Sequence, residues 1–450
     1  MFKEVFKVKP SYWLLVPAIL QATIPWLAFR IRIIYVFALM LLWVAVNCEE
    51  VERVFMAKSS GVFRNALFWF IVYDFLNNVY ALVGFGDFST YNEATISLAQ
   101  MVYFLVAHYV VVTNKYRGLK FLTFWALIGF VIAGLMSLRG WGVEGLEGAR
   151  ALTGTGAREL SGERMEVIMD AIDIGLGDYR YVYLCAWLFG IMLMVFGMAK
   201  TMSLRLLSIT VAIACAISVR MGGLGTPAFS MGVSAMLVVG WWILNKRRKI
   251  VKILGYILII TITFYYVAPV VYKPFSAPLR FIGNNMSEGS IKTRISLIAD
   301  LFEGDDNYAL ERARAQLISW DTFCSYPILG EGMYHFDYEK GSKNHLGGHS
   351  LILDRLGKSG IIGFIPFILF LYWLGKYYED ITWNRFGKGW LAIPTMFIVI
   401  FVFSSIANPT FGVPQVMYII LPGIAYLIAV SRNELQSPFR TQRPMFPMPY

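Results

Sequence analysis

The chain has 450 residues and a mass of 51.1 kDa, with 57% hydrophobic residues, 15% charged residues and a mean hydropathy of +0.58. Soluble globular proteins contain about 45–50% apolar and about 25% charged residues. The composition therefore excludes disordered, coiled-coil and disulfide-scaffold classes and argues against a single soluble core. It indicates a protein embedded in lipid, where an apolar exterior carries no solubility penalty. The chain has four cysteines, Cys48, Cys185, Cys215 and Cys324, and three of them lie in or beside apolar runs. They have no zinc-type spacing and indicate no disulfide framework.

Apolar runs of about 17–22 residues recur along the chain, the length with which a helix crosses the hydrocarbon core. The N-terminus resembles a signal peptide but lacks an A-x-A-like cleavage site, so we expect an uncleaved first helix. The sequence thus predicts an all-α polytopic membrane protein. We place about twelve spans, at positions 11–28, 33–48, 65–83, 93–113, 121–138, 181–199, 206–219, 228–245, 250–268, 360–376, 390–405 and 416–430.

The net charge of +11 and the pI near 9.3 are explained by topology. When both termini are placed inside and the spans alternate, Lys and Arg gather in the inside connections, as at 245–252 (NKRRKIVK). Acidic residues gather in the outside connections. We therefore predict cytoplasmic N- and C-termini, and we expect no nucleic-acid partner.

This topology divides the chain into four segments: spans one to nine at 1–268, a large outside loop at 269–359, the last three spans at 360–430 and a polar inside tail at 431–450. The loop is too long for a plain connector. One stretch in it has Ile291, Ile295 and Ile298 at helical spacing. We expect short amphipathic helices over the outer mouth of the bundle. The second such helix, at 308–324, is predicted to carry its apolar residues on one side: Ala309, Ala313, Leu317, Trp320 and Phe323.

Soluble-enzyme motifs are absent, and the informative residues lie near the predicted outer face. The segment 349–363 (HSLILDRLGKSGIIG) begins with His349, and its glycines would let the next span start close against its neighbours. An imidazole just outside the membrane can accept a proton near neutral pH. A histidine in this position is, taken alone, more often a cap or a packed residue.

Two arginines form the other candidates. Arg312 precedes Pro327, which opens the turn P-I-L-G-E-G, within the segment 312–332 (RARAQLISWDTFCSYPILGEG). Arg220 stands at the outer end of the seventh span, in SVRMGGLGTP, where glycines allow close backbone approach. Taken alone, Arg312 is explained as a solvated helix charge and Arg220 as a side chain that reaches the membrane interface.

Together these segments resemble the O-antigen ligase/polymerase superfamily of integral-membrane glycosyltransferases. That family shows R-x-x-x-W…P-l-l-G-x-G…H-N-x-x-L…G-x-x-G in a large external loop, and S-R-G at the outer end of an earlier helix. This chain departs from it at Gln316, where Trp is usual, and at Ser350, where Asn is usual, and it has V-R-M-G for S-R-G. Arg314 is an alternative match for the first arginine. The residues that fit are Arg220, Arg312, Pro327, Gly330, Gly332, His349, Leu353, Gly360 and Gly363.

The resemblance implies a GT-C-like fold and transfer of a glycan from an undecaprenyl-diphosphate carrier at the periplasmic face of the bacterial inner membrane. It implies no cofactor and no metal. Arg220 and Arg312, with Arg314 as the alternative, would bind the diphosphate leaving group through forked, charge-assisted hydrogen bonds. His349 would orient or deprotonate the acceptor hydroxyl, or contact the diphosphate; we favour the first role. Glu331 ranks below His349 as a second acid–base group.

The same donor chemistry serves two family activities. We favour a polymerase that joins lipid-linked repeat units of a surface polysaccharide, with the bilayer and a chain-length regulator as further partners. The alternative is a ligase that transfers the finished glycan to lipid A-core. A flippase or transporter is a distant alternative, since it would carry inverted repeats and several buried charges.

Two polar residues lie within predicted spans. Asp74 accompanies Asn77 and Asn78 in the third span, and an acid inside a span is a functional candidate by default. Because no basic partner is expected at that depth, we interpret Asp74 as a structural hydrogen-bonding group. His108, in the fourth span, is interpreted as a packed bundle residue.

Overall fold

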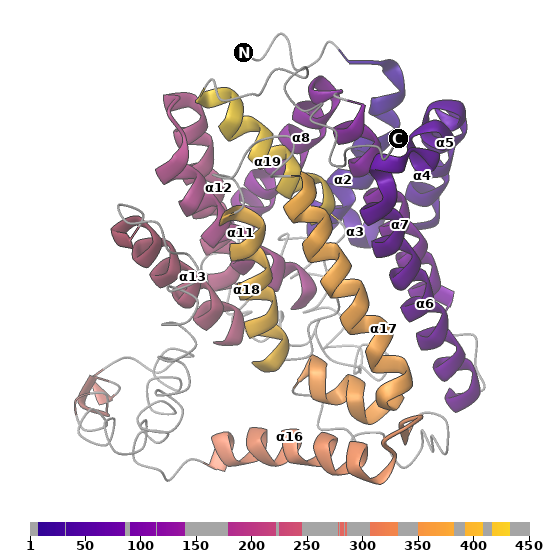
Figure 1. Ribbon diagram of the computed structural model, residues 1–450. Helices are drawn as coiled ribbons and strands as arrows, with labels where there is room; N and C mark the ends of the chain where they lie inside the picture. Colours follow the sequence, from indigo (N-terminus) through magenta and orange to yellow (C-terminus); the bar gives the residue numbers. More distant parts are fainter. Residues whose placement is uncertain are drawn as a thin grey trace, which may run out of the picture.

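The computed structural model describes residues 8–31, 33–85, 91–113, 115–139, 179–221, 225–244, 307–331, 350–381, 392–407 and 416–432, with short pieces between 278 and 285. In these ranges the regular structure is entirely helical (Figure 1). The first group of helices is η1 (Pro10–Leu15), α2 (Val16–Thr23), α3 (Pro25–Arg30), α4 (Ile33–Val46), α5 (Cys48–Met56), η2 (Lys58–Ser60), α6 (Gly61–Phe85), α7 (Tyr91–Val112) and α8 (Tyr116–Arg139). The second group is α11 (Tyr179–Met198), α12 (Met202–Met221), α13 (Gly225–Leu244), α16 (Asn307–Ser325), α17 (Leu351–Ile381), α18 (Ala392–Ala407) and α19 (Met417–Ser431).

Several of these helices are apolar enough to mark a membrane protein. Among the described residues, 4 helices have the length and composition to cross a bilayer, or up to 5 if α4 and α5, bent by 78°, form one span. Shorter apolar helices lie at Gln100–Val112, Ile393–Val402 and Met417–Ser431. The predicted number of spans therefore stays a prediction, and the ninth span, at 250–268, lies outside the described residues.

The first predicted span is wrong as a single helix. Positions 11–28 form η1, α2 and the start of α3, because Ile24 is extended (φ −119°, ψ 106°) immediately before Pro25. A proline ring disfavours helical backbone in the residue before it. The tenth span is also longer than predicted, since α17 begins at Leu351 and breaks at Gly360, where the sequence places the start of the span.

Helices α6 and α17 pack side by side in opposite directions along much of their length. Aromatic contacts record the register: Phe63 faces Tyr377, Phe70 faces Phe370 and Tyr73 faces Phe367, with ring centroids 5.9, 4.9 and 5.2 Å apart. The remaining helices gather around α8 and α11. Small residues permit close approach here, as a Cβ on Gly134 of α8 would lie 2.5 Å from that of Ala214 in α12.

Two buried polar side chains illustrate hydrogen bonding between helices of the bundle. The Trp187 indole donates to Ser404 Oγ at 3.0 Å, linking α11 to α18. His108 is 3% exposed, lies 2.8 Å from Ser60 Oγ and stacks on Phe63, as interpreted from the sequence. Such pairing removes the penalty of an unsatisfied polar group in an apolar surrounding.

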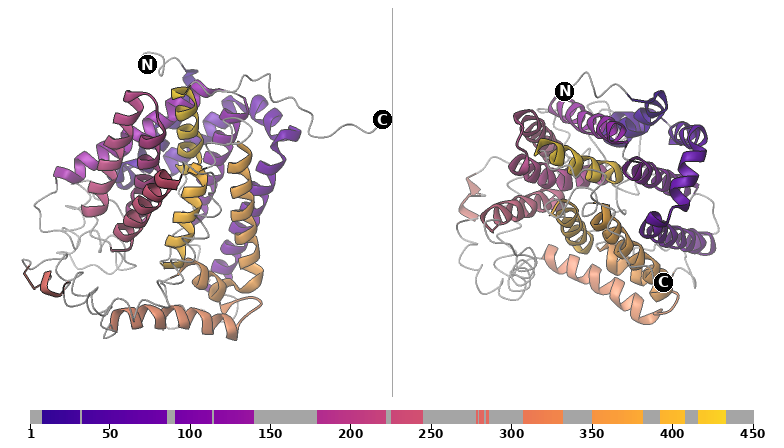
Figure 2. Two further views of the ribbon diagram at one scale, coloured as in Figure 1. Left: turned by 60° about the vertical axis from the view of Figure 1, so that its left-hand side comes forward. Right: turned by 45° about the horizontal axis from the view of Figure 1, so that its top comes forward.

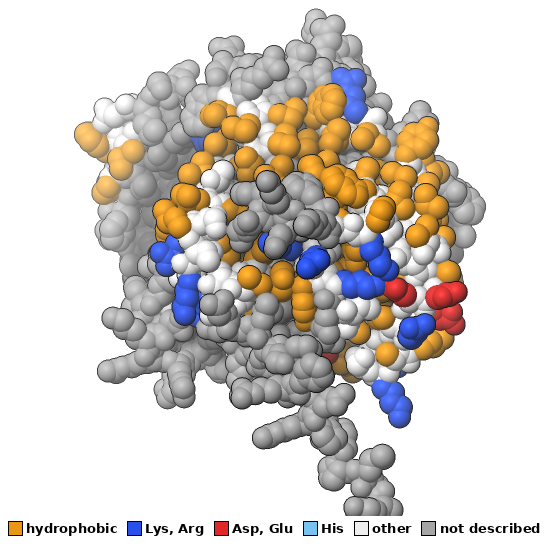
Figure 3. Space-filling model, turned by 90° about the horizontal axis from the view of Figure 1, so that it is seen from above, with side chains coloured by type: hydrophobic (Ala, Val, Ile, Leu, Met, Phe, Trp, Pro, Cys, Tyr) orange, Lys and Arg blue, Asp and Glu red, His pale blue; other side chains and the backbone are white. Residues whose placement is uncertain are grey.

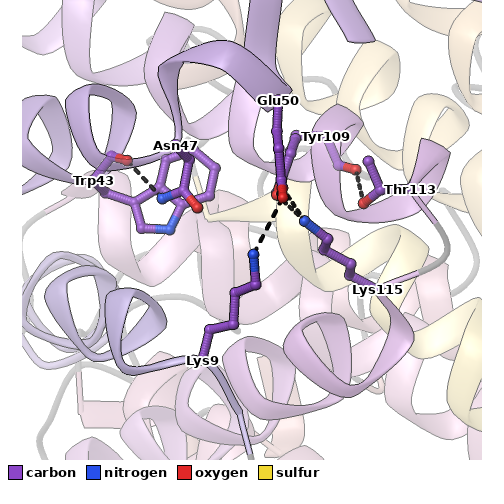
Figure 4. Close-up of polar contacts among 7 residues, drawn as sticks. All are labelled: Lys9, Trp43, Asn47, Glu50, Tyr109, Thr113 and Lys115. Atoms are coloured by element: carbon purple, nitrogen blue, oxygen red, sulfur yellow. Dashed lines mark hydrogen bonds and ion pairs between the residues drawn. The ribbon is translucent and has the colours of Figure 1, made fainter. Parts of the chain in front are cut away.

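One end of the bundle carries a cluster of charges around Glu50 (Figure 4). Lys9 lies 3.2 Å from the Glu50 carboxylate, and Lys115 and the Tyr109 hydroxyl both donate to it. The cluster joins η1, α5 and the α7–α8 connection. Hydrogen bonds from Lys115 and Tyr109 lower the pKa of Glu50 to about 2.

Further basic residues mark the same end of the bundle. Arg432 donates from Nε to the Met198 carbonyl at 2.8 Å, and Arg205 donates to the Ala199 carbonyl at 2.8 Å. Tyr116, at the start of α8, stacks on Tyr426 of α19, which brings this group to the end that carries Lys115. Figure 3 shows Lys and Arg side chains at several places on the face seen from above. We call this the basic end; its residues are Lys9, Lys115, Lys200, Arg205 and Arg432.

At the opposite end, α16 lies across the bundle beside the start of α17 (Figure 1 and Figure 2). The predicted helix at 308–324 is confirmed by α16. On its predicted apolar side Leu317 and Trp320 are 58% and 46% exposed, whereas Ser319 and Thr322 are buried. The predicted helix around Ile295 lies outside the described residues.

Candidate functional site

The turn after α16 packs directly against the break in α17. Gly330 has φ +71° and Gly360 has φ +56° with ψ −164°, regions that side chains other than glycine strongly disfavour. A Cβ on Gly330 would lie 2.5 Å from the Gly360 amide nitrogen, and one on Gly360 would lie 2.6 Å from the Gly330 nitrogen. The contact therefore requires glycine at both positions. We call it the glycine clasp, and define it as the packing of residues 327–330 against Gly360.

The clasp also satisfies backbone groups that the break in α17 exposes. A helix that starts anew after a break has amide groups with no partner in the preceding turn. Here the Ile361 amide donates to the Pro327 carbonyl at 2.9 Å, and the Ile362 amide donates to the Ile328 carbonyl at 3.2 Å. The turn therefore acts as the N-terminal cap of the longer part of α17.

A single carboxylate fixes the beginning of α17 and attaches α16 to it. Asp354 accepts a hydrogen bond from Ser319 Oγ of α16 at 2.5 Å and another from the Ser350 amide at 3.2 Å. The Leu353 amide donates to Ser350 Oγ at 3.3 Å, so Ser350 and Asp354 cap the helix reciprocally. Ser350, which departs from the family's usual Asn, is thus a helix cap immediately after His349.

Glu331 follows the clasp directly. Its side chain is only 8% exposed, and its neighbour Gly330 contacts the backbone of Lys358 and Gly360. An acid in such a place can exchange a proton with a bound ligand. Within the described ranges, no three His, Cys, Asp or Glu side chains gather closely enough to hold a metal ion.

Of the predicted site residues Arg220, Arg312 and His349, only Arg220 has a described side chain. Arg220 is exposed in the last turn of α12, at the end remote from Met202 and the basic end. Arg312 and Arg314 belong to α16, but their side chains lie outside the described part of the chain. His349 and Gly332 lie outside it as well. The two motif segments are therefore joined through their glycines. The distances between the side chains of Arg220, Arg312 and His349 lie outside the described part of the chain.

A second polar cluster lies between α6 and α17. Arg355 donates from Nη1 to Asn77 Oδ1, and its guanidinium lies 5.2 Å from the Tyr73 ring centroid. Asn78 donates to the Asp74 carboxylate at 3.2 Å. Arg355 thus reaches the part of α6 that carries Asp74, but its hydrogen bond goes to Asn77, so a basic partner for Asp74 is not shown among the described residues.

Sequence reasoning did not single out Ser319, Asp354 or Arg355. The spacing of Ser350 and Asp354 at the start of a helical pattern is a capping signal that could have identified Asp354. No local pattern relates Ser319 or Asn77 to α17, since each contact joins residues far apart in the chain.

Comparison with known proteins gives no match, either with a protein-family model or with a curated protein sequence.

Proposed function

We propose that this protein is a metal-independent glycosyltransferase, which at the periplasmic face of the membrane transfers a glycan from an undecaprenyl-diphosphate donor to a lipid-linked acceptor. We propose a surface-polysaccharide polymerase as its specific activity and the bacterial inner membrane as its location. The glycine clasp is the observation that carries this proposal. It unites the P-I-L-G and G-I-I-G segments, the two halves of the motif on which the family resemblance rests.

The clasp supports a site built from residues distant in sequence. It fixes the C-terminal end of α16 against α17; Arg312 lies in the N-terminal part of α16, and α17 begins shortly after His349. Asp354 and Ser319 hold the same two helices together about two helical turns away. A reaction centre needs such rigid positioning, because misplacing a reacting group by about 1 Å costs about a hundredfold in rate.

The register of α16 favours Arg312 over Arg314 as the diphosphate ligand. Position 312 precedes Ser319 by about two helical turns and therefore stands on the face that meets α17. Position 314 is turned about 140° away from Ser319. The exposed residues Leu317 and Asp321 lie nearer to that direction.

In the proposed reaction the acceptor hydroxyl attacks the anomeric carbon while the bond from that carbon to the diphosphate oxygen breaks. His349 accepts the hydroxyl proton, and the undecaprenyl diphosphate leaves with the bonding electron pair. Arg220 and Arg312 stabilise the negative charge that grows on the diphosphate, which is worth several kcal/mol where water is scarce. A single displacement of this kind inverts the anomeric centre.

The test is transfer by the purified protein in liposomes that contain an undecaprenyl-diphosphate-linked repeat unit. We expect products longer by whole repeats, detected by mass spectrometry, and loss of most activity in Arg312→Ala. Arg312→Lys should recover little, because a point charge cannot replace a forked donor. Arg314→Ala is the matched control and should retain activity.

Other outcomes would redirect or refute the proposal. Growth only on a lipid A-core acceptor would make the protein a ligase with the same donor chemistry. Movement of the lipid-linked glycan across the bilayer without a new glycosidic bond would make it a transporter. A severe Arg314→Ala defect with an active Arg312→Ala variant would refute the assignment from helix register.

A further inference from the structure

The polar cluster between α6 and α17 contains the cation Arg355 and the anion Asp74, but among the described residues no ion pair joins the two. Arg355 is half-buried, and its contacts are the neutral amide of Asn77 and the ring of Tyr73. Among the residues that the structure describes, no carboxylate lies within ion-pair distance of its guanidinium. Its sequence neighbour Asp354 directs its two oxygens to Ser319 and to the Ser350 amide.

The position of Arg355 raises the free-energy cost of a guanidinium that has no ion-pair partner among the described residues. Helix α6 has 25 residues and is therefore about 37 Å long, somewhat more than the hydrocarbon thickness of about 30 Å. Asn77 lies about 12 Å from the α6 end at Phe85 and within the third predicted span, 65–83, so on the predicted topology it lies inside the hydrocarbon layer. Ionisable side chains at such depth usually pair with a counter-charge or mark a ligand site.

The guanidinium is also held in place rather than mobile. Asn77 Oδ1 accepts from one of its nitrogens, and the Tyr73 ring lies against the planar group. The carbonyl of Arg355 accepts from Ser359 Oγ at 2.8 Å, immediately before the break at Gly360. A planar fork fixed on one side retains donors that suit the oxygens of a phosphate group.

Apolar side chains flank the cluster on the outside of both helices. On α6 these are Ile71 and Phe75, 45% and 64% exposed, and on α17 they are Ile361, Ile362 and Ile365, all between 44% and 49% exposed. A ligand with a phosphate and a hydrocarbon chain would match both parts of this surface. A soluble anion would match only the arginine.

We propose that Arg355, oriented by Asn77 and Tyr73, binds the phosphate group of a lipid whose hydrocarbon chain lies along α6 and α17. The ligand class is a phosphate-bearing membrane lipid, either a glycerophospholipid or a polyprenyl diphosphate. This binding site is separate from the three residues proposed for transfer and does not depend on glycosyl transfer occurring.

The test is lipid binding by the delipidated full-length protein in detergent, measured as dissociation constants and as ligand-induced shifts of the unfolding temperature. The probes are phosphatidylglycerol, undecaprenyl diphosphate, inorganic pyrophosphate and the phosphate-free lipid diacylglycerol. We expect Arg355→Gln to weaken binding of at least one phosphate-bearing lipid about tenfold or more. Arg117→Gln is the matched control, since Arg117 is exposed next to Tyr116 near the basic end, and it should bind as the wild type does.

Stability of the ligand-free protein separates a binding role from a structural one. Removing a guanidinium that forms no ion pair among the described residues should leave the unfolding temperature of Arg355→Gln unchanged or raise it, while the lipid-induced shift disappears. If Arg355→Gln does not fold, Arg355→Lys takes its place and should still lose affinity severalfold because it lacks the forked donor.

Three results would overturn the proposal. The first is a lower unfolding temperature of the ligand-free variant together with unchanged lipid affinity. The second is equal binding of phosphatidylglycerol and diacylglycerol by the wild type. The third is pyrophosphate binding as tight as that of both lipids, which would remove the role of the hydrocarbon chain. Whether phosphatidylglycerol or undecaprenyl diphosphate binds more tightly identifies the source of the phosphate, and an inactive but lipid-binding protein would leave the inference intact.

Discussion

At the basic end of the bundle, Lys9 and Lys115 converge on the carboxylate of Glu50, which is 41% exposed, whereas at the clasp end the backbones of Gly330 and Gly360 touch. Exposed ion pairs contribute little to stability because water and salt screen them. Backbone contacts at positive φ leave no room for another side chain. The clasp end therefore tolerates less change than the basic end, which is the property expected of a site where geometry matters.

The two ends should lie on opposite sides of the membrane. Cys48, at the start of α5, and Cys324, in α16, are both exposed and provide native labels for the basic end and the clasp end. With the basic end cytoplasmic, an impermeant thiol reagent should label Cys324 in intact spheroplasts and Cys48 only after the membrane is opened. Labelling of both from the outside would contradict the predicted topology.

Adding one methyl group to the clasp should have the largest energetic effect. Gly360→Ala forces alanine into φ +56° and places its Cβ against the Gly330 nitrogen, which should destabilise the protein by on the order of 3 kcal/mol and abolish transfer. Thermal unfolding in detergent and the transfer assay measure this. Gly232→Ala is the matched control, because a Cβ there meets nothing within 4 Å. Equal stability of the two variants would show that the clasp does not form.

The hydrogen bond between Ser319 and Asp354 should have an intermediate effect. Asp354→Ala removes the α17 cap and the link to α16, which should lower stability by about 2 kcal/mol. A double-mutant cycle with Ser319→Ala should give a coupling energy of about 1–2 kcal/mol. Ser325→Ala on the same helix, whose hydroxyl donates to the Asp321 carbonyl at 2.9 Å, should be nearly neutral. Strict additivity of Asp354→Ala and Ser319→Ala would indicate that the two side chains do not interact.

The charge cluster at Glu50 should contribute least, and its contribution should depend on pH. Hydrogen bonds from Lys115 and Tyr109 lower the pKa of Glu50 from 4.5 to about 2. Its stabilisation is therefore fully present above pH 4.5 and is lost as the pH falls toward about 2. The difference in unfolding temperature between the wild type and Glu50→Gln should be constant above pH 4.5 and shrink below it. Glu52→Gln, exposed on the same helix, is the control, and a difference that grows on acidification would reverse the assigned sign.

Hydropathy and motif spacing predicted the helical membrane fold and the residues of the clasp, but not their contact. Gly330 and Gly360 could be identified from the motif, whereas the packing of one backbone on the other joins two segments separated by a long stretch of chain. The break of the first span at Pro25 could have been inferred from the proline alone.

The errors came from contacts that no local pattern encodes. The apolar pattern of α16 does not show which side packs on the bundle: Ser319 is turned inward by its hydrogen bond to Asp354, and Leu317 is outside. The contact of Arg355 was not predicted either, since the sequence places Arg355 in the outside loop, and its partner Asn77 lies far away in the sequence.

The most direct test of the proposed site is an experimental structure of the protein with undecaprenyl diphosphate bound. The account predicts that the guanidinium groups of Arg220 and Arg312 both lie within hydrogen-bond distance, about 3 Å, of the diphosphate oxygens. It predicts His349 a few ångströms away on the side from which an acceptor hydroxyl attacks, in a cavity that opens sideways to lipid. Arg220 facing lipid, or His349 on the far side of the bundle from both arginines, would contradict the mechanism even if the glycine clasp is present.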